Sequence, residues 1–252
     1  MSSIPVRSGF VWRIVHSRTS GLITTHFAPL LFAGMMITGI VQDIWDLEAM
    51  YAQSPAPVVA IFMGIGLALG AAAHHISHRL AAHDTKSAWI IAGVGFAGGT
   101  LPVGLVLSAW ILQAITVFTV LVVVLRVAHF LRTVATLIAP NRYPTWPQVG
   151  MMLYTYLSML TAFTLINLAM DLLHTLHPSV TPAFNFITAG GSPLVNAFYF
   201  SVVVMTTLGF GDITPLTSLA KISVALQCLT SYVMFALLVG VAMRGVLSNE
   251  DE

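Results

Sequence analysis

The residues with the clearest chemical purpose form one short stretch, 205–212, with the sequence MTTLGFGD. Gly209 and Gly211 alternate with larger residues, and glycine adopts positive φ at little cost. An extended segment with alternating left-handed residues can turn all its carbonyl oxygens to one side. With the Thr207 hydroxyl below them, such a row of oxygens can replace the water around a dehydrated cation. A ring of oxygens needs several copies around one axis, so the stretch predicts an oligomeric cation pore.

The composition indicates an integral membrane protein. The chain has 252 residues, 57% of them hydrophobic and 8% charged, against about 25% charged residues in typical soluble domains. The formal net charge is +1, and no basic run indicates nucleic-acid binding. Cys228 is the one cysteine, which excludes an intrachain disulfide. We therefore expect an all-α membrane protein.

The elements that must position the stretch are apolar segments. A hydrocarbon core of about 30 Å requires roughly 20 apolar residues per helix. The predicted spans are 22–41, 58–76, a short third span from residue 88, 103–126, 149–173 and 218–242. The third and fourth spans form one apolar run that is too long for a single helix across a bilayer. We place the break at residues 98–102 (GGTLP), whose glycines and proline are typical of a turn.

Basic residues predict the topology. If both termini are cytoplasmic, Lys221 alone among the lysines and arginines lies outside. The cytoplasmic ones are Arg7, Arg13, Arg18, Arg79, Lys86, Arg126, Arg132, Arg142 and Arg244. This bias supports an even number of spans. We expect a multi-pass protein of the plasma (inner) membrane, divided into a cytoplasmic N-terminus (1–21), a four-helix domain (22–132), a linker (133–148), a pore domain (149–245) and a cytoplasmic tail (246–252).

A short helix leads into the stretch from the polar loop before it. Ser192 and Pro193 are typical of a helix start, a cap residue followed by a proline in the first turn. A helix from Pro193 to about Thr206 would direct the partial negative charge of its C-terminus toward a cation. Non-helical backbone at membrane depth is tolerated only where it is buried in protein or lines water. A pore at an oligomer axis meets that condition.

Residues 207–212 (TLGFGD) resemble the T-V-G-Y-G-D selectivity filter of potassium channels, and the likeness extends over about 196–215. The resemblance implies a homotetramer of the prokaryotic kind. Each chain would have six transmembrane helices, with a re-entrant pore helix and one filter between the fifth and sixth. It implies no cofactor besides K⁺ ions in the filter, and membrane lipid as the surroundings.

The same resemblance implies the site residues. The filter segment is Thr206, Thr207, Leu208, Gly209, Phe210, Gly211 and Asp212. The implied K⁺ ligands are the backbone oxygens of Thr207, Leu208, Gly209 and Phe210, with the Thr207 hydroxyl. Asp212 would lie at the outer mouth, where its charge attracts cations and braces the filter.

Three positions depart from the family's pattern. Phe210 lacks the hydroxyl of the commoner tyrosine, which puts filter rigidity in question, although phenylalanine occurs there in some subfamilies. Val203 stands where some members carry a buried carboxylate behind the filter. Ser231 stands about where many members have a hinge glycine, and Gly240 lies lower on the same helix. Ser231 and Gly240 are therefore the candidate gating positions on this helix.

The fourth span has few charges for sensing voltage. Arg126, His129 and Arg132 fall three apart at its inner end. Voltage sensing uses charge that moves through the field, at about 2.3 kcal/mol per charge per 100 mV and with about 3–4 charges per subunit. Two arginines fall short of that, and the interiors of the first three spans contain no acidic partner. We expect a weak or absent voltage response, with interfacial anchoring as the alternative role of these residues.

Other polar residues leave alternatives open. His74 and His78 are one helical turn apart and could share a metal or a haem iron, or with His75 respond to pH near neutrality. A role as polar residues at the membrane edge is favoured. Asp171, near the outer end of the fifth span, is either a filter-supporting or an interfacial group.

The sequence as a whole predicts a K⁺-selective channel that conducts passively and is weakly or not voltage-gated. The alternatives are a weakly voltage-sensitive or pH-modulated K⁺ channel and a non-selective cation channel. A metal- or haem-binding membrane enzyme is the least favoured, because no catalytic constellation is visible. The sequence identifies no regulatory partner.

Overall fold

The computed structural model describes residues 18–45, 47–79, 85–102, 109–137, 146–177, 179–186 and 190–243. Their helices are α2 (Arg18–Ile44), α3 (Leu47–Gln53), α4 (Pro55–Arg79), α5 (Thr85–Thr100), α7 (Ala109–Leu137), α8 (Trp146–Asp171), α9 (Leu173–Leu176), α10 (Pro193–Met205) and α11 (Ser218–Ala242). Among the described residues, the β structure is one isolated bridge between Phe184 and Pro215. The fold is mostly helical, as the composition predicts.

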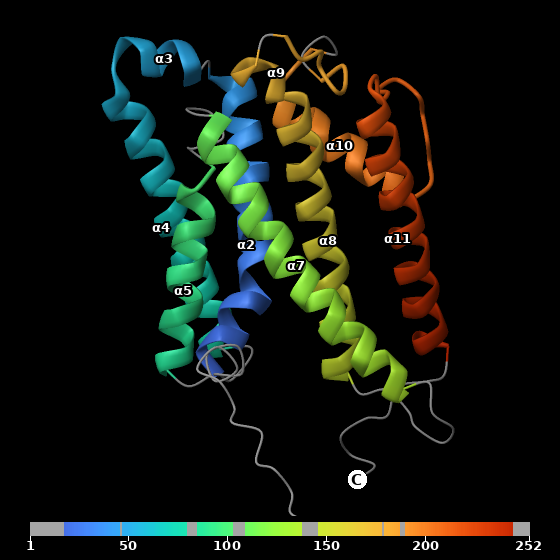
Figure 1. The fold of residues 1–252 in the computed structure, drawn as a ribbon. Coiled ribbons are helices and arrows are strands. Elements are labelled where there is room, and N and C mark those ends of the chain that lie inside the picture. The colour runs from blue at the N-terminus through green and yellow to red at the C-terminus, as the bar shows by residue number, and fades with distance from the viewer. Residues whose placement is uncertain are drawn as a thin grey trace, which may run out of the picture.

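Glycines bring α2, α4 and α5 together on the left of Figure 1. A Cβ added at Gly34 would lie 1.9 Å from the carbonyl oxygen of Gly98, and one added at Gly99 would lie 2.6 Å from Gly66 Cα. Only residues without a side chain allow two backbones to approach so closely. Such small-residue contacts are typical of helices packed within membranes.

The break between the third and fourth predicted spans is present, but its residues differ from the prediction. Gly98 and Gly99 are helical residues of α5, so their assignment to a turn is wrong. They serve helix packing instead. The turn is at residues 101–102, and the next described residue is the start of α7.

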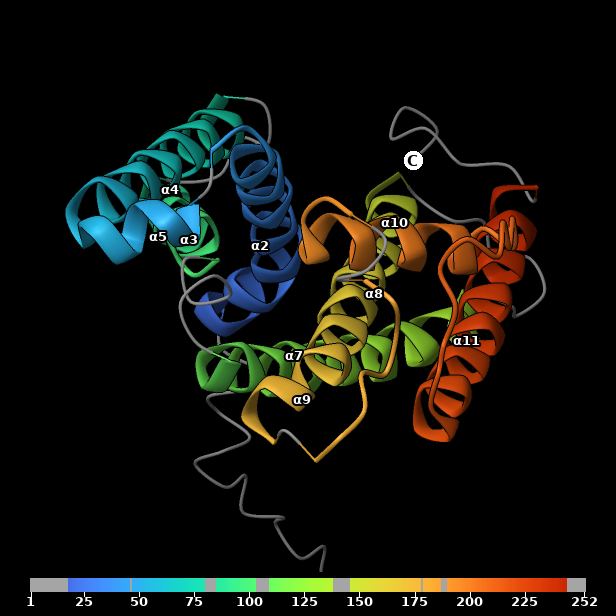
Figure 2. The same cartoon turned by 90° about the horizontal axis from the view of Figure 1, so that it is seen from above.

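α8 is the central helix of the second half of the chain. It packs against α2, α7, α10 and α11, and Figure 2 shows it between α7 and α10. The largest core cluster joins these helices to the loop that follows α9, through Leu165, Phe184 and Phe200. The pore region thus shares one core with α2.

Among the residues that the structure describes, three helical segments are long and apolar enough to cross a membrane by length and composition. They are Pro55–His78, Gln148–Asp171 and Ser218–Val241. Shorter apolar helical stretches are His26–Gln42, Trp110–Leu125 and Pro193–Met205. α11 has the bounds predicted for the sixth span, whereas α3 and α9 are helices that the sequence analysis does not predict.

Some predictions fall outside the described residues. These are Arg7, Arg13, Arg142, Arg244 and the tail 246–252. α7 contains Arg126, His129 and Arg132. The structure describes their backbone and not their side chains. α7 continues to Leu137, within the range assigned to the linker, whose residues 138–145 are not described.

Candidate functional site

α10 ends in a Schellman motif that starts the filter segment. The Leu208 N–H donates to the carbonyl oxygen of Val203 at 3.0 Å, and the Thr207 N–H donates to that of Val204 at 3.1 Å. These are the two bonds that define the motif, and its left-handed position is usually glycine. Here Thr207 occupies it, with φ of 61°. For a β-branched residue this conformation is an outlier that costs about 1–2 kcal/mol.

Positive φ recurs at every second residue after the helix. Its values are 61° at Thr207, 58° at Gly209 and 79° at Gly211. This is the alternating backbone that the sequence predicts for the two glycines, with Thr207 added. Residues 206–212 are all exposed, Leu208 and Phe210 by 60% and 65%. The segment stands at the edge of the molecule beyond α10, away from α4 and α5 (Figures 1 and 2).

The far end of the segment is held by Tyr199 and Asn185. The Tyr199 hydroxyl donates to Asp212 Oδ2 at 2.8 Å. Asn185 Nδ2 donates to the Asp212 carbonyl oxygen at 3.2 Å, and Asn185 Oδ1 accepts from the Thr214 N–H at 3.0 Å. The hydrogen bond from Tyr199 holds the pKa of Asp212 below its ordinary value of 3.8. Asp212 is therefore a carboxylate at neutral pH.

Tyr199 supplies the hydroxyl that position 210 lacks. Its ring stacks on that of Phe210, with centroids 6.4 Å apart and planes 8° apart. Tyr199, on α10, thus contacts the filter segment through both its ring and its hydroxyl. The side chain of Phe210 contributes only an apolar ring.

Asp171 supports the loop that pairs with the chain after the filter segment. Its side chain is buried, and Oδ1 accepts a hydrogen bond from the Phe184 N–H at 2.7 Å. The neighbouring Ala183 carbonyl oxygen accepts from the Leu216 N–H at 2.8 Å, and Phe184 forms the bridge to Pro215. Of the two roles left open by the sequence, the contacts favour filter support.

Sequence reasoning missed a buried polar cluster between α8, α10 and α11. Asn167 Nδ2 lies 3.1 Å from both Ser201 Oγ and Gln227 Oε1, to which it can donate. Gln227 Nε2 donates to the Ser201 carbonyl oxygen at 3.3 Å. All three side chains are fully buried. They tie α8, α10 and α11 together, and the available signal was their polarity within apolar helices, which is typical of functional positions.

The remaining predicted positions lie apart from this cluster. Val203 is buried on α10. Ser231 is buried on α11 and donates to the Cys228 carbonyl oxygen of the same helix at 3.0 Å. A Cβ at Gly240 would have open space around it. α11 is continuous over both positions, from Ser218 to Ala242.

The histidines of α4 lie on the opposite side of the molecule from the filter segment. The rings of His74 and His78 stack with centroids 5.9 Å apart, and His74 also contacts Trp89 of α5. Within the described part of the chain, no group of three or more His, Cys, Asp and Glu side chains is placed to hold a metal.

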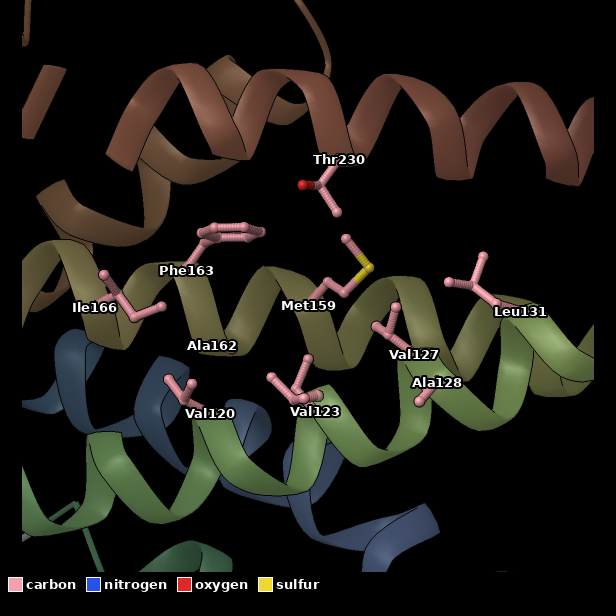
Figure 3. A pocket seen from close by; sticks show the side chains of 11 residues that line it. Val120, Val123, Val127, Ala128, Leu131, Met159, Ala162, Phe163, Ile166 and Thr230 are labelled. Atoms are coloured by element: carbon pink, nitrogen blue, oxygen red, sulfur yellow. The ribbon is translucent and has the colours of Figure 1, made fainter. Parts of the chain in front are cut away.

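An apolar cavity of about 350 Å³ lies between α7, α8 and α11 (Figure 3). Val123, Met159 and Phe163 line it, and the hydroxyl of Thr230 on its far wall donates to the Leu226 carbonyl oxygen. The cavity therefore offers no charged group or free donor to a polar substrate.

Comparison with known proteins agrees with this geometry. Residues 172–247 match the model of a protein family described as ion channel. The match covers the loop before α10, the filter segment and α11. No curated protein and no solved structure matches the chain.

The matched region is an ion channel domain, and with the apolar helices it identifies a membrane protein. The match indicates a channel and not an enzyme.

Proposed function

We propose that the protein is a potassium-selective channel that conducts K⁺ passively as a homotetramer. The observation that carries the proposal is the alternation of positive φ at Thr207, Gly209 and Gly211 within the sequence TLGFGD. It supports a row of backbone oxygens from residues 207–210, with the Thr207 hydroxyl, as the K⁺ ligands. Asp212 would stand as a carboxylate at the outer mouth.

The exposure of the segment supports the tetramer. Leu208 and Phe210 are apolar and exposed at the edge of one chain. One copy provides oxygens on one side of an ion only, while four copies around an axis surround it. In that arrangement, α10 is the pore helix, and its C-terminus points its partial negative charge inward.

The helix arrangement supports six spans. α2, α4, α5, α7, α8 and α11 are the six long helices among the described residues. The start of α2 and the end of α11 lie at the same end of the molecule in Figure 1, which agrees with an even number of crossings. We place the channel in the plasma (inner) membrane with both termini in the cytoplasm.

The proposed channel is weakly or not voltage-gated. The basic residues of α7 number two arginines, fewer than the gating charges of a typical sensor. Ser231 and Gly240 on α11 are the proposed gating positions. A conductance that rises steeply with voltage in bilayer recordings would contradict this part of the proposal.

Reconstitution tests the proposal directly. Purified protein in planar bilayers with K⁺ on one side and Na⁺ on the other is expected to give a reversal potential close to the K⁺ equilibrium potential. Equal permeability to both ions would replace the proposal with a non-selective cation channel. Absence of any cation current from correctly inserted protein would count against both.

A further inference from the structure

α2 contacts the proposed pore helix, α10, at three places along its length. The rings of Phe32 and Phe198 meet with centroids 5.1 Å apart. A Cβ added at Gly39 would lie 2.5 Å from Val195 Cγ2. Farther along, the Ser192 hydroxyl donates to Gln42 Oε1 at 3.0 Å.

These contacts follow one stripe on each helix. Position 32 of α2 meets position 198 of α10, and position 39 meets position 195. Position 42 meets the N-cap of α10 at position 192. Spacings of three and seven residues return to the same face of a helix. The two helices therefore meet along a continuous line, and the contact is a property of both elements.

Ser192 is used for this contact and not for capping. It is the N-cap of α10, and its side chain forms no capping hydrogen bond. The N-cap position normally spends its hydroxyl on the first turn of its own helix. Here the Ser192 hydroxyl donates to Gln42 of α2, so the start of α10 is fixed against α2.

The opposite end of α10 determines the filter segment. The Schellman bonds of Thr207 and Leu208 return to Val204 and Val203 of that helix. α10 has 13 residues, and an α-helix rises about 1.5 Å per residue. Because α10 is short and rigid, a shift at its start also displaces the filter segment at its end.

α2 is in turn fixed to α5. A Cβ at Gly98 would lie 2.7 Å from the Leu30 carbonyl carbon, and the Gly34 contact lies on the same side. α5 packs equally closely on α4 through Gly66 and Gly99. α2 thus links the proposed pore helix to the closely packed helices α4 and α5.

We propose that α2 positions the pore helix, with Gly39 and Gln42 as positioning residues for the filter. This inference rests on the proposed function of residues 206–212. Movement of α4 or α5 would then reach the filter through α2, without passing through α11.

A size exchange at the Gly39 contact tests the inference. Gly39→Ala is expected to lower K⁺ flux from liposomes by about tenfold, because overpacking displaces Val195 and with it α10. Val195 Cγ2 is the one close atom that the new methyl group would meet. The double variant Gly39→Ala/Val195→Ala is therefore expected to recover most of the flux. Gly64→Ala is the matched control, since a Cβ at Gly64 meets nothing within 4 Å.

Two further measurements separate positioning from general stability. Gln42→Leu removes the acceptor of the Ser192 hydroxyl and is expected to lower K⁺ over Na⁺ selectivity, whereas Gln42→Glu keeps an acceptor oxygen and retains it. Hydrogen exchange of the amides of residues 206–208 is expected to rise in Gly39→Ala and not in Gly64→Ala. The exchange measurement needs no ion current, so it tests the inference even if the wild-type channel is non-selective.

Unchanged flux, selectivity and exchange in Gly39→Ala would overturn the role of α2 and leave the proposed function intact. A non-selective wild-type channel would overturn the proposed function alone. Loss of flux in Gly39→Ala that the second substitution does not restore would show general misfolding and would also overturn the inference.

Discussion

Thr207 carries a conformational cost at the site. A β-branched residue at φ of 61° is disfavoured, and glycine at this position would relieve the strain. Glycine would also remove the hydroxyl that the proposed ion site uses. The surrounding structure maintains the conformation through the two Schellman bonds, as is expected where strain persists at a functional position. The backbone at Thr207 is thus set by the helix end and not by the residue's own preference.

Gly209→Ala is expected to abolish selective K⁺ current. A Cβ at Gly209 meets no atom within 4 Å in the chain, and φ is 58°, so the effect is one of backbone conformation, at about 1–2 kcal/mol. In a fourfold assembly this cost would arise in every subunit. Bilayer recording measures the loss, with Gly150→Ala on α8 as a control that has open space around it. Selective current that survives in Gly209→Ala would contradict the filter assignment.

Tyr199→Phe is expected to shift acid block of the channel to higher external pH. The hydrogen bond from Tyr199 depresses the pKa of Asp212 below 3.8. A depressed carboxyl keeps its charge, and the stability that the bond provides, above its ordinary pKa, and loses both as pH falls through the lower value. Without the hydroxyl, the pKa of Asp212 returns toward 3.8 and the charge is lost earlier in an acid titration.

The measurement is K⁺ current against external pH on the acidic side of neutrality. Asp212→Asn is the reference in which this carboxylate does not titrate at all. Superimposable acid curves for the native protein and Tyr199→Phe would show that Asp212 does not control the outer mouth.

At the scale of elements, the length of an apolar run predicts where a helix lies, but the local sequence does not predict what a glycine does within it. The bounds of α11 follow from where its apolar run begins and ends, and α10 follows from Ser192 and Pro193. Gly98 and Gly99 have the composition of a turn, yet they lie inside α5. Their role depends on Gly34 and Gly66, residues of two other helices that no local pattern connects to them.

The polar cluster between α8, α10 and α11 escaped prediction for the same reason. Asn167 is separated from Ser201 by 34 positions and from Gln227 by 60. The polarity of each residue within an apolar helix marks it as a candidate, but no local pattern connects the three. Only the packing of α8, α10 and α11 brings the three side chains together. By contrast, the filter is contiguous in sequence, and a contiguous motif can be read without knowledge of the fold.

Asn167→Leu is expected to destabilise the protein by about 1–3 kcal/mol, because it leaves the buried Gln227 Oε1 without its donor. Thr164→Val is the matched control on the same helix. Its hydroxyl donates only to the Leu160 carbonyl oxygen, one turn away. Thermal unfolding in detergent compares the two variants with the native protein. Equal destabilisation by Asn167→Leu and Thr164→Val would mean that the hydrogen bond between Asn167 and Gln227 stabilises the protein no more than a hydrogen bond within one helix.

For the whole molecule, the exposed surface indicates what a single chain lacks. The face of α11 carries large apolar side chains that are half or more exposed, namely Leu219, Ile222, Leu226, Leu229, Tyr232, Val233 and Phe235. Leu208 and Phe210 of the filter segment are also more than half exposed. Apolar residues of a membrane protein can face lipid, but a filter segment cannot, because its backbone groups would go unsatisfied there. The proposed assembly covers the segment with three further copies of itself.

This coverage predicts a stability that depends on the ion present. If K⁺ binds the assembled filter and not the separated chains, it stabilises the tetramer by mass action, by about 2.7 kcal/mol at 100 times its dissociation constant. Native gel electrophoresis after heating is expected to show the tetramer surviving to higher temperature in K⁺ than in Na⁺ at equal ionic strength. Gly209→Ala, whose defect lies at the ion ligands, is expected to assemble but to lose the difference between the two ions. Equal melting in K⁺ and Na⁺ for the native protein would separate assembly from ion binding and would remove the filter from its proposed place at the tetramer axis.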